Sequence, residues 1–306
     1  MLVIYKYITS QSVANLTVME LNENGQNFAV IGCPIEHSLS PVLHNEVFKQ
    51  TGIVAQYSKL NIEEENLAEF VETFRIGKIK GINVTLPHKE HIIPLLDDIN
   101  PWANSIGAVN CVLKTNLTLI GYNTDWYGFS MLLESNGIQA DDKSCLIVGA
   151  GGVSKSVVYS LIQSGVKSIT ITNRTLNNAC KLVDHFKIIS HQTELTSIPL
   201  DISKIEKLKP DIIINCTSVG MSPDFSDTPL PDYPFHSRQI LVDTIYNPLK
   251  SQLMKDAENG GAKVINGMDM FIYQGLASLD LWLKMDISKQ VKYTELKDHL
   301  TEILSI

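Results

Sequence analysis

Ser144–Ser154, with the sequence SCLIVGAGGVS, sets a continuously apolar segment directly before a glycine-rich turn. The apolar segment has the length of a buried strand, and the amphipathic residues 155–164 after the turn have the pattern of a helix. In this context, glycines allow backbone amides at a helix N-terminus to approach a pyrophosphate. A tight turn without a ligand is the alternative, because Ser154 replaces the third glycine of the usual fingerprint. The stretch predicts a dinucleotide site at Gly149, Ala150, Gly151, Gly152 and Val153.

The next apolar segment, residues 168–172, bears on the choice of dinucleotide. NAD sites usually carry an acidic residue about 20 residues after the glycines, where it binds the ribose hydroxyls. Here the segment runs into Asn173, Arg174 and Thr175, with no acidic residue. A guanidinium and a hydroxyl suit a 2′-phosphate, so we predict NADP at these residues, with NAD as a possible second cofactor. An Arg174 that is merely solvated is the alternative.

On both sides of residues 144–175, apolar segments of strand length alternate with amphipathic segments of helix length. Alternation of this kind predicts an α/β fold with mostly parallel sheets, and a chain of 306 residues predicts two domains. The expected strands are 28–32, 57–61, 81–86, 144–149, 168–172, 212–215, 239–244 and 263–265, with a hairpin at 111–114 and 117–122. The expected helices are 41–51, 63–75, 126–136, 155–164, 268–283 and 291–306.

A second informative stretch, Gly81–Lys89, reads GINVTLPHK. Pro87 cannot continue a central strand, and ligands of open α/β sheets collect at the carboxyl ends of strands. Alternation puts the side chains of Asn83 and Thr85 on one side of this strand, with Lys89 just beyond its end. We expect a small polar ligand there; a solvated lysine after an ordinary strand is the alternative.

Composition excludes several other classes of protein. The net charge of −8 argues against a nucleic-acid binder, and no apolar run is long enough to span a membrane. The first residues lack the basic and apolar regions of a signal peptide. The five cysteines have no C-x-x-C spacing, which favours reduced thiols in the cytoplasm, and no Cys/His cluster suggests a metal. We therefore expect a cytoplasmic protein without a metal.

Several further blocks occur in a fixed order along residues 28–285, and together they resemble the shikimate dehydrogenase family. Residues 1–18 lie outside the resemblance. The blocks are IEHSLSP at 35–41, NVTLPHK at 83–89, GAVN at 107–110, GYNTD at 121–125, GAGGV at 149–153, NRT at 173–175, NCTSVGM at 215–221, YNP at 246–248, and Gly267-Met268 with Gln274.

The resemblance implies an oxidoreductase that reversibly reduces 3-dehydroshikimate to shikimate with NADPH, in chorismate and aromatic amino acid biosynthesis. It also implies a substrate domain built from 1–123 plus 268–306, a Rossmann-type NADP domain at 124–267, and a cleft between them. Such a protein would bind small molecules, neither nucleic acid nor membrane, and would be a monomer or a homodimer.

The resemblance implies roles for individual residues as well. Lys89 and Asp125 correspond to the catalytic pair. The implied substrate contacts are Ser38 and Ser40 for the carboxylate, Asn83, Thr85, Asn110 and Asp125 for the ring hydroxyls, and Tyr246 and Gln274 nearby. Further implied cofactor contacts are Thr217, Ser218, Gly220, Met221 and Gly267. For the Ser38–Ser40 pair, a simple helix cap is the alternative.

Three rival functions stay open from the sequence. One is a quinate/shikimate dehydrogenase that uses NAD or both cofactors. Another is a catalytically silent relative that senses the ligand, against which the presence of both Lys89 and Asp125 counts. The third is a dinucleotide-binding module of an unrelated reductase, against which the Ser38–Ser40 and Asn83–Lys89 blocks count.

Overall fold

The computed structural model describes residues 25–190, 192–221 and 224–305. Chain contacts divide it into two compact units. Of the described residues, the first unit comprises those up to Asn100 together with Val109–Tyr122, and the second comprises Pro101–Ala108 and those from Asn123 onward. Expectations on residues 1–24 lie outside the described residues.

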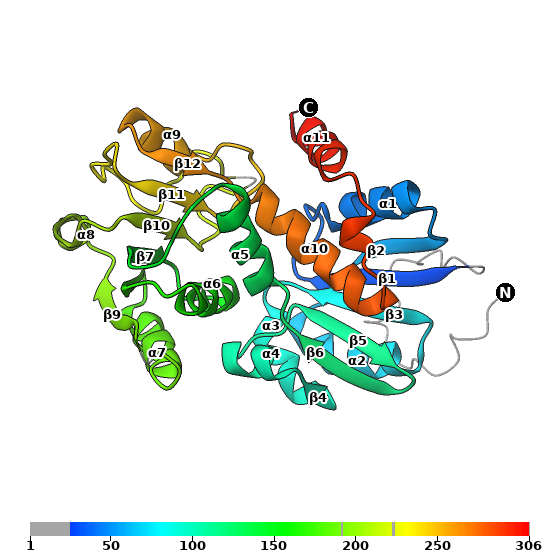
Figure 1. The fold of residues 1–306 in the computed structure, drawn as a ribbon. Coiled ribbons are helices and arrows are strands. Elements are labelled where there is room, and N and C mark those ends of the chain that lie inside the picture. The colour runs from blue at the N-terminus through cyan, green and yellow to red at the C-terminus, as the bar shows by residue number, and fades with distance from the viewer. Residues whose placement is uncertain (1–24, 191, 222–223, 306) are drawn as a thin grey trace. The chain divides into compact units, whose positions relative to one another are not determined.

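The first unit is built on a six-stranded sheet in the order β2-β1-β3-β5-β6-β4 (Figure 1). β1, β2 and β3 are parallel, β5 is antiparallel to β3 and β6, and β4 is parallel to β6. The mostly parallel sheet that the sequence predicts is therefore joined to an antiparallel hairpin. The strands are β1 Gln26–Gly32, β2 Ala55–Asn61, β3 Ile79–Val84, β4 Asp98–Ile99, β5 Cys111–Thr115 and β6 Thr118–Tyr122.

Short helices connect these strands. α1 (Ser40–Thr51) has Pro41 in its first turn and ends at Gly52, whose φ of 71° lies in the left-handed region. α2 (Leu67–Ile76) buries Leu67, Phe70, Val71 and Phe74, the spacing of one helix face. The predicted helix 63–75 is divided, because a 3₁₀ turn at Glu64–Asn66 precedes α2. A one-turn helix, α3 (His88–His91), and a second 3₁₀ turn, Ile93–Leu95, follow β3.

The second unit contains an all-parallel sheet in the order β12-β11-β10-β7-β8-β9. The chain reverses its direction of travel across the sheet between β7 and β10, the arrangement of doubly wound dinucleotide-binding folds. The strands are β7 Ser144–Val148, β8 Ser168–Asn173, β9 Glu194–Pro199, β10 Ile212–Asn215, β11 Ile240–Asp243 and β12 Lys263–Ile265.

Apolar side chains on both faces of this sheet are covered by helices. Ile147, Ile169 and Ile171 pack in one core cluster with residues of α5, α6 and α7. Leu146, Ile213 and Leu241 pack in another with residues of α8 and α9. The helices are α4 Pro101–Ile106, α5 Asp125–Ser135, α6 Gly152–Gln163, α7 Leu176–Phe186, α8 Ile202–Leu208, α9 Gln252–Asn259, α10 Met268–Leu283 and α11 Tyr293–Leu304, with a 3₁₀ turn at Ile287–Lys289.

The last two helices, α10 and α11, belong to the second unit by their contacts. α10 crosses α5 closely at Gly128, where a Cβ would lie 2.6 Å from the Met270 carbonyl oxygen. Asp269 accepts hydrogen bonds from Tyr293 and Lys297 of α11 and from Asn136. Burial alone would raise the pKa of Asp269, but these donors outweigh burial and hold the pKa below its usual value. The assignment of residues 268–306 to the substrate domain stays a prediction.

Candidate active site

Asn83 lies at the end of β3, and both ends of its amide have partners. The Tyr57 hydroxyl donates to Asn83 Oδ1 at 2.7 Å, and Asn83 Nδ2 donates to the Asn110 carbonyl at 3.1 Å. The Val84 amide donates to the same Asn110 carbonyl at 2.8 Å. The structure therefore brings the predicted residues Asn83 and Asn110 together, with the Asn83 amide nitrogen on the side of Asn110.

Tyr57 is a residue that the sequence analysis missed. It lies in β2, is almost fully buried, and stacks on the ring of His44 with 3.9 Å between ring centroids. His44 Nδ1 is 2.7 Å from the Ser40 carbonyl oxygen. This contact chain connects the predicted residues Ser40 and Asn83. A tyrosine in an apolar strand carries no signal of such a role, because its partner comes from a strand 26 residues later.

Thr85 and Lys89 follow Asn83 beyond the assigned end of β3. The strand stops at Val84, two residues short of the predicted end, yet hydrogen bonding to β1 continues from Thr85 N to Ile31 O and from Cys33 N to Leu86 O. Lys89 lies in α3 and is only 6% exposed. Its carbonyl accepts from the Val109 amide at 2.8 Å, which ties Lys89 to the segment leading into Asn110.

Ser38 lies in the turn between β1 and α1, and Ser40 begins α1. Leu39 occupies the N-cap position of α1 and makes no capping hydrogen bond through its side chain. Ser38 Oγ accepts from the Ser40 amide at 3.3 Å, so the Ser38 hydroxyl also stabilises the turn locally. Ser40 is buried at the first position of the helix. A hydroxyl that accepts one bond can still donate its own proton to an anion.

Asp125, the predicted partner of Lys89, begins α5 in the second unit and is 5% exposed. A carboxylate is favourable in the first turn of a helix because of the helix dipole. The preceding loop is fixed by Asn123, whose Nδ2 donates to the Ala108 carbonyl at 2.9 Å, and by Thr124, whose hydroxyl is 3.2 Å from that of Ser278. Lys89 belongs to the first unit, and its pairing with Asp125 stays a prediction.

Tyr246 and Gln274 meet at Phe271 on α10. The rings of Tyr246 and Phe271 stack with centroids 4.3 Å apart, and Gln274 Nε2 donates to the Phe271 carbonyl at 2.8 Å. Gln274 also packs against Gly128 of α5, the helix that begins with Asp125. The second unit thus holds Asp125 and Gln274 on two crossing helices, and Tyr246 in the segment after β11 packs against one of them.

The glycine-rich turn joins β7 to α6 as predicted. Gly149 has a φ of 111° and donates its amide proton to the Thr172 carbonyl at 2.8 Å. Gly151 caps α6, and a Cβ on it would meet no atom within 4 Å. The Ser154 hydroxyl, at the third glycine position, lies 3.2 Å from the Gly151 amide and accepts its proton. An open helix N-terminus bordered by glycine fits a pyrophosphate.

Asn173, Arg174 and Thr175 follow at the end of β8, the strand beside β7 in the sheet. Asn173 Nδ2 donates to the Thr175 carbonyl at 3.0 Å, which closes a tight turn. Arg174, Thr175 and Lys181 are exposed. This exposed cation and hydroxyl next to the glycine turn fit the 2′-phosphate end of NADP.

The remaining predicted cofactor residues lie after β10 and before α10. Asn215 Oδ1 accepts from both the amide and the hydroxyl of Thr217, and the Thr217 hydroxyl accepts from the Val219 amide at 3.2 Å. The Met221 amide donates to the Ser218 carbonyl, and Gly220 has a φ of 89°. At Gly267 a Cβ would lie 2.1 Å from the Thr244 carbonyl oxygen, so the chain there requires glycine.

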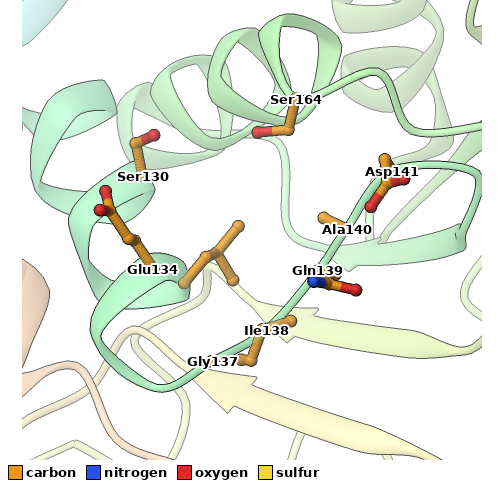
Figure 2. Close-up of a pocket in the computed structure, with 9 residues that line it drawn as sticks. Ser130, Glu134, Gly137, Ile138, Gln139, Ala140, Asp141 and Ser164 are labelled. Carbon is orange, nitrogen blue, oxygen red and sulfur yellow. The ribbon is translucent and has the colours of Figure 1, made fainter.

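A surface hollow of about 380 Å³ lies in the second unit at the carboxyl ends of α5 and α6 (Figure 2). Ser130 and Glu134 of α5, Ser164 and the loop through Asp141 surround it. None of the predicted site residues lines this hollow. The proposed chemistry therefore rests on the strand ends described above.

Comparison with known proteins identifies the family. The profile described as "Shikimate dehydrogenase substrate binding domain" matches residues 30–112, and that described as "Shikimate / quinate 5-dehydrogenase" matches residues 132–222. The shikimate dehydrogenase (NADP(+)) of Bacillus cereus is 41% identical over 258 residues, which are 84% of this chain and 92% of the relative. The chain belongs to the shikimate dehydrogenase family.

Solved shikimate dehydrogenases share the fold. One in complex with NADP+ has a TM-score of 0.83 at 32% identity and covers 93% of this chain and 97% of its own. The Thermus thermophilus enzyme in complex with NADP(H) and shikimate has a TM-score of 0.78 at 33% identity, over 90% of this chain and 99% of its own. The predicted family and α/β fold class are confirmed.

No described helix is both long and apolar enough to cross a membrane.

Proposed function

We propose that this member of the shikimate dehydrogenase family is an NADP-dependent oxidoreductase that interconverts 3-dehydroshikimate and shikimate. The observation that carries the proposal is the buried ammonium of Lys89, tied through its backbone to the segment that holds Asn110 beside Asn83. A lysine is rarely this buried without a specific task. Similarity over nearly the full length of NADP-dependent shikimate dehydrogenases supports the same function.

Reduction of the substrate ketone requires a proton at the ketone oxygen. The bound NADPH would supply a hydride to the ketone carbon of the substrate. Lys89 stabilises the negative charge that develops on the ketone oxygen and then gives that oxygen its proton. Asp125 orients the ammonium.

Substrate recognition uses side chains of the first unit together with Tyr246 and Gln274 of the second. Ser38 and Ser40 donate hydroxyl protons to the substrate carboxylate. Because Tyr57 donates to Asn83 Oδ1, Asn83 donates a hydrogen bond to a ring hydroxyl from its amide nitrogen. Thr85, Asn110, Tyr246 and Gln274 complete the set of ring contacts.

Cofactor recognition belongs to the second unit. The N-terminus of α6 and the glycines Gly149, Gly151 and Gly152 bind the pyrophosphate, whose charge the helix dipole favours. Arg174, with Asn173 and Thr175, binds the 2′-phosphate. Thr217, Ser218, Gly220 and Met221 line the nicotinamide end. Residues 124–267 form the cofactor domain, and 1–123 with 268–306 take the substrate.

A spectrophotometric assay tests the function. Purified protein with shikimate and NADP+ should produce the absorbance of the reduced nicotinamide, and 3-dehydroshikimate should consume it in reverse. Turnover of quinate with NAD+ in place of this pair would assign the chain to the quinate-using branch. Absence of turnover with shikimate, quinate and both dehydro forms would refute a dehydrogenase. We expect a cytoplasmic monomer or homodimer.

A further inference from the structure

Asp243 lies at the end of β11, directly beside Asn215 at the end of β10. The two are Cα partners in the parallel ladder, and both side chains are fully buried. Asn215 Nδ2 donates to Asp243 Oδ1 at 3.0 Å. Family resemblance contributed Asn215 only as part of a sequence block, and nothing in the sequence analysis singled out Asp243.

The Asp243 carboxylate accepts hydrogen bonds on both oxygens. Besides Asn215, the Ile245 amide donates to Oδ1 at 3.1 Å, and the Ser251 hydroxyl donates to Oδ2. Ser251 is itself the N-cap of α9 and accepts from the Met254 amide at 3.3 Å. A buried carboxylate with these donors is held in one orientation, because any rotation would leave a buried group unsatisfied.

Asp243 in turn determines the orientation of the Asn215 amide. With Nδ2 held by the carboxylate, Oδ1 must point toward Thr217, where it accepts from the Thr217 amide at 3.0 Å and the hydroxyl at 2.7 Å. A flipped amide would set an N–H group against both donors. The turn that begins the segment 216–221 therefore depends on Asp243.

This turn also lies against the glycine-rich turn. A Cβ on Gly149 would come within 3.0 Å of Thr217 Cγ2 and 3.1 Å of the Cys216 carbonyl carbon. If Thr217 shifted, its side chain would therefore move into or out of the space beside Gly149, where other residues would carry a Cβ. The chain of contacts runs from Ser251 through Asp243, Asn215 and Thr217 to the proposed pyrophosphate site.

We propose that Asp243 is a positioning residue for cofactor binding, which fixes the segment 216–221 against the glycine-rich turn by holding the Asn215 amide. Asp243 acts through Asn215 and does not touch the cofactor. The inference rests on the proposed NADP site. It adds to that site the residue that holds the segment 216–221 in place.

The test compares two substitutions at opposite ends of the same strand. Asp243→Leu removes all three acceptor interactions at the end of β11. Gln239→Leu removes a comparable buried group just before β11, where Nε2 donates to the Pro210 carbonyl at 3.1 Å and the Tyr233 hydroxyl at 2.8 Å. Both variants should lower the melting temperature, but only Asp243→Leu should affect the cofactor.

Direct titration with NADP+ should give a dissociation constant raised about 10- to 100-fold in Asp243→Leu, the effect of losing buried hydrogen bonds to a charged group. Gln239→Leu should bind within about threefold of wild type, a margin well below the effect of one such bond. Asp243→Asn keeps the Oδ1 acceptor and should restore most of the affinity. Equal weakening by Gln239→Leu and Asp243→Leu, or no rescue by Asp243→Asn, would overturn the inference.

Hydrogen exchange of the cofactor-free protein separates this inference from the proposed function. The Thr217 and Val219 amides should exchange faster in Asp243→Leu than in Gln239→Leu. Unchanged exchange would contradict the inference even if wild type binds NADP+. If wild type shows no NADP+ binding but these amides respond, the proposed function fails, while the hold of Asp243 on the segment 216–221 through Asn215 stands. If Asp243→Leu does not fold, Ser251→Ala should produce smaller increases in the NADP+ dissociation constant and in exchange of the Thr217 and Val219 amides. Absence of these increases would equally contradict the positioning role of Asp243.

Discussion

At the scale of single residues, the half-buried Lys114 and the buried Lys89 of the first unit differ in what surrounds them. Lys114 donates to the carbonyls of Phe74 and Gly77, and burial, with a contribution from the Lys80 charge, lowers its pKa to about 8. Lys114 thus closes the end of α2. Lys89 instead lies in α3, just after β3, in the same short segment as the proposed substrate residues Asn83 and Thr85.

Replacing these lysines should separate catalysis from stability. Lys89→Ala should lower kcat about 10²- to 10⁴-fold, the usual effect of losing a proton-transfer group. Lys114→Ala should lower the free energy of unfolding and leave kcat within a few-fold of wild type. Steady-state kinetics and urea unfolding of both variants provide the measurement. A Lys89→Ala enzyme that kept its kcat and changed only KM would make Lys89 a binding residue.

Tyr57 gives a second prediction at this scale. Tyr57→Phe removes the donor to Asn83 Oδ1 and leaves the amide held only through its bond to the Asn110 carbonyl, so KM for shikimate should rise about 10-fold, the effect of one buried hydrogen bond, with a smaller change in kcat. Affinity for NADP+ should not change. Tyr233→Phe, which alters a similarly buried hydroxyl in the second unit, is the control. An unchanged KM in Tyr57→Phe would show that Asn83 is oriented without Tyr57.

Asp243 predicts a pH dependence of stability. Burial raises its pKa to about 6, although Ser251, Ile245 and Asn215 donate to it; the nearby Cys216 thiol, whose pKa burial raises, stays neutral. The folded protein therefore holds this proton more tightly than the unfolded chain, and the associated stability is lost as pH rises from about 4 through 6. Relative to Asp243→Asn, wild type should lose roughly 2 to 3 kcal/mol across this range, at about 1.4 kcal/mol per pKa unit. Urea unfolding at both ends of the range measures the difference, and a pH-independent difference would contradict it.

At the scale of elements, a long apolar segment could be predicted from the sequence, whereas an exposed edge strand and a helix without a clear start signal could not. α10 was expected at 268–283 and has those bounds, because its apolar residues recur over four turns. β9 was missed because it is an edge strand of half-exposed residues that ends in proline. α7 was missed because it begins with Leu-Asn-Asn, although it buries Ala179, Leu182, Val183 and Phe186 at helical spacing.

The candidate site divides in the same way. Residues at strand ends, such as Asn83 and Arg174, could be predicted because chain order and turn chemistry indicate those ends. Tyr57 and Asp243 could not be predicted, because their roles depend on which strands pair. Tyr57 reaches Asn83 across β1, and Asp243 meets Asn215 only through the register of β10 and β11.

The end of β8 carries a prediction at the element scale. Arg174→Ala removes the exposed guanidinium beside the glycine turn, so the dissociation constant for NADP+ should rise about 10- to 100-fold, as for loss of a charge-assisted bond to phosphate. Affinity for NAD+, which lacks the 2′-phosphate, should change little. Titration of wild type and variant with both dinucleotides measures this. Equal weakening of NAD+ and NADP+ would refute the 2′-phosphate role.

At the scale of the whole molecule, the chain combines two α/β units with different sheets. The first has a mixed sheet that supplies neutral hydrogen-bond donors and a buried amine, and the second has an all-parallel sheet with a glycine turn. A net charge of −8 is compatible with anionic ligands only where local donors and cations outweigh it, as at Lys89 and Arg174. Local cations of this kind, which suit small anionic ligands, are consistent with membership of the shikimate dehydrogenase family.

The most direct test of the central claim is the specificity constant, kcat/KM, measured for shikimate and for quinate with each of NADP+ and NAD+. We predict the highest value for shikimate with NADP+, and at least about 10-fold lower values for the other three pairs, since NAD+ lacks the 2′-phosphate and quinate carries an additional ring hydroxyl that the proposed contacts do not bind. Equal or higher values for quinate with NAD+, or no turnover with any pair, would contradict the account.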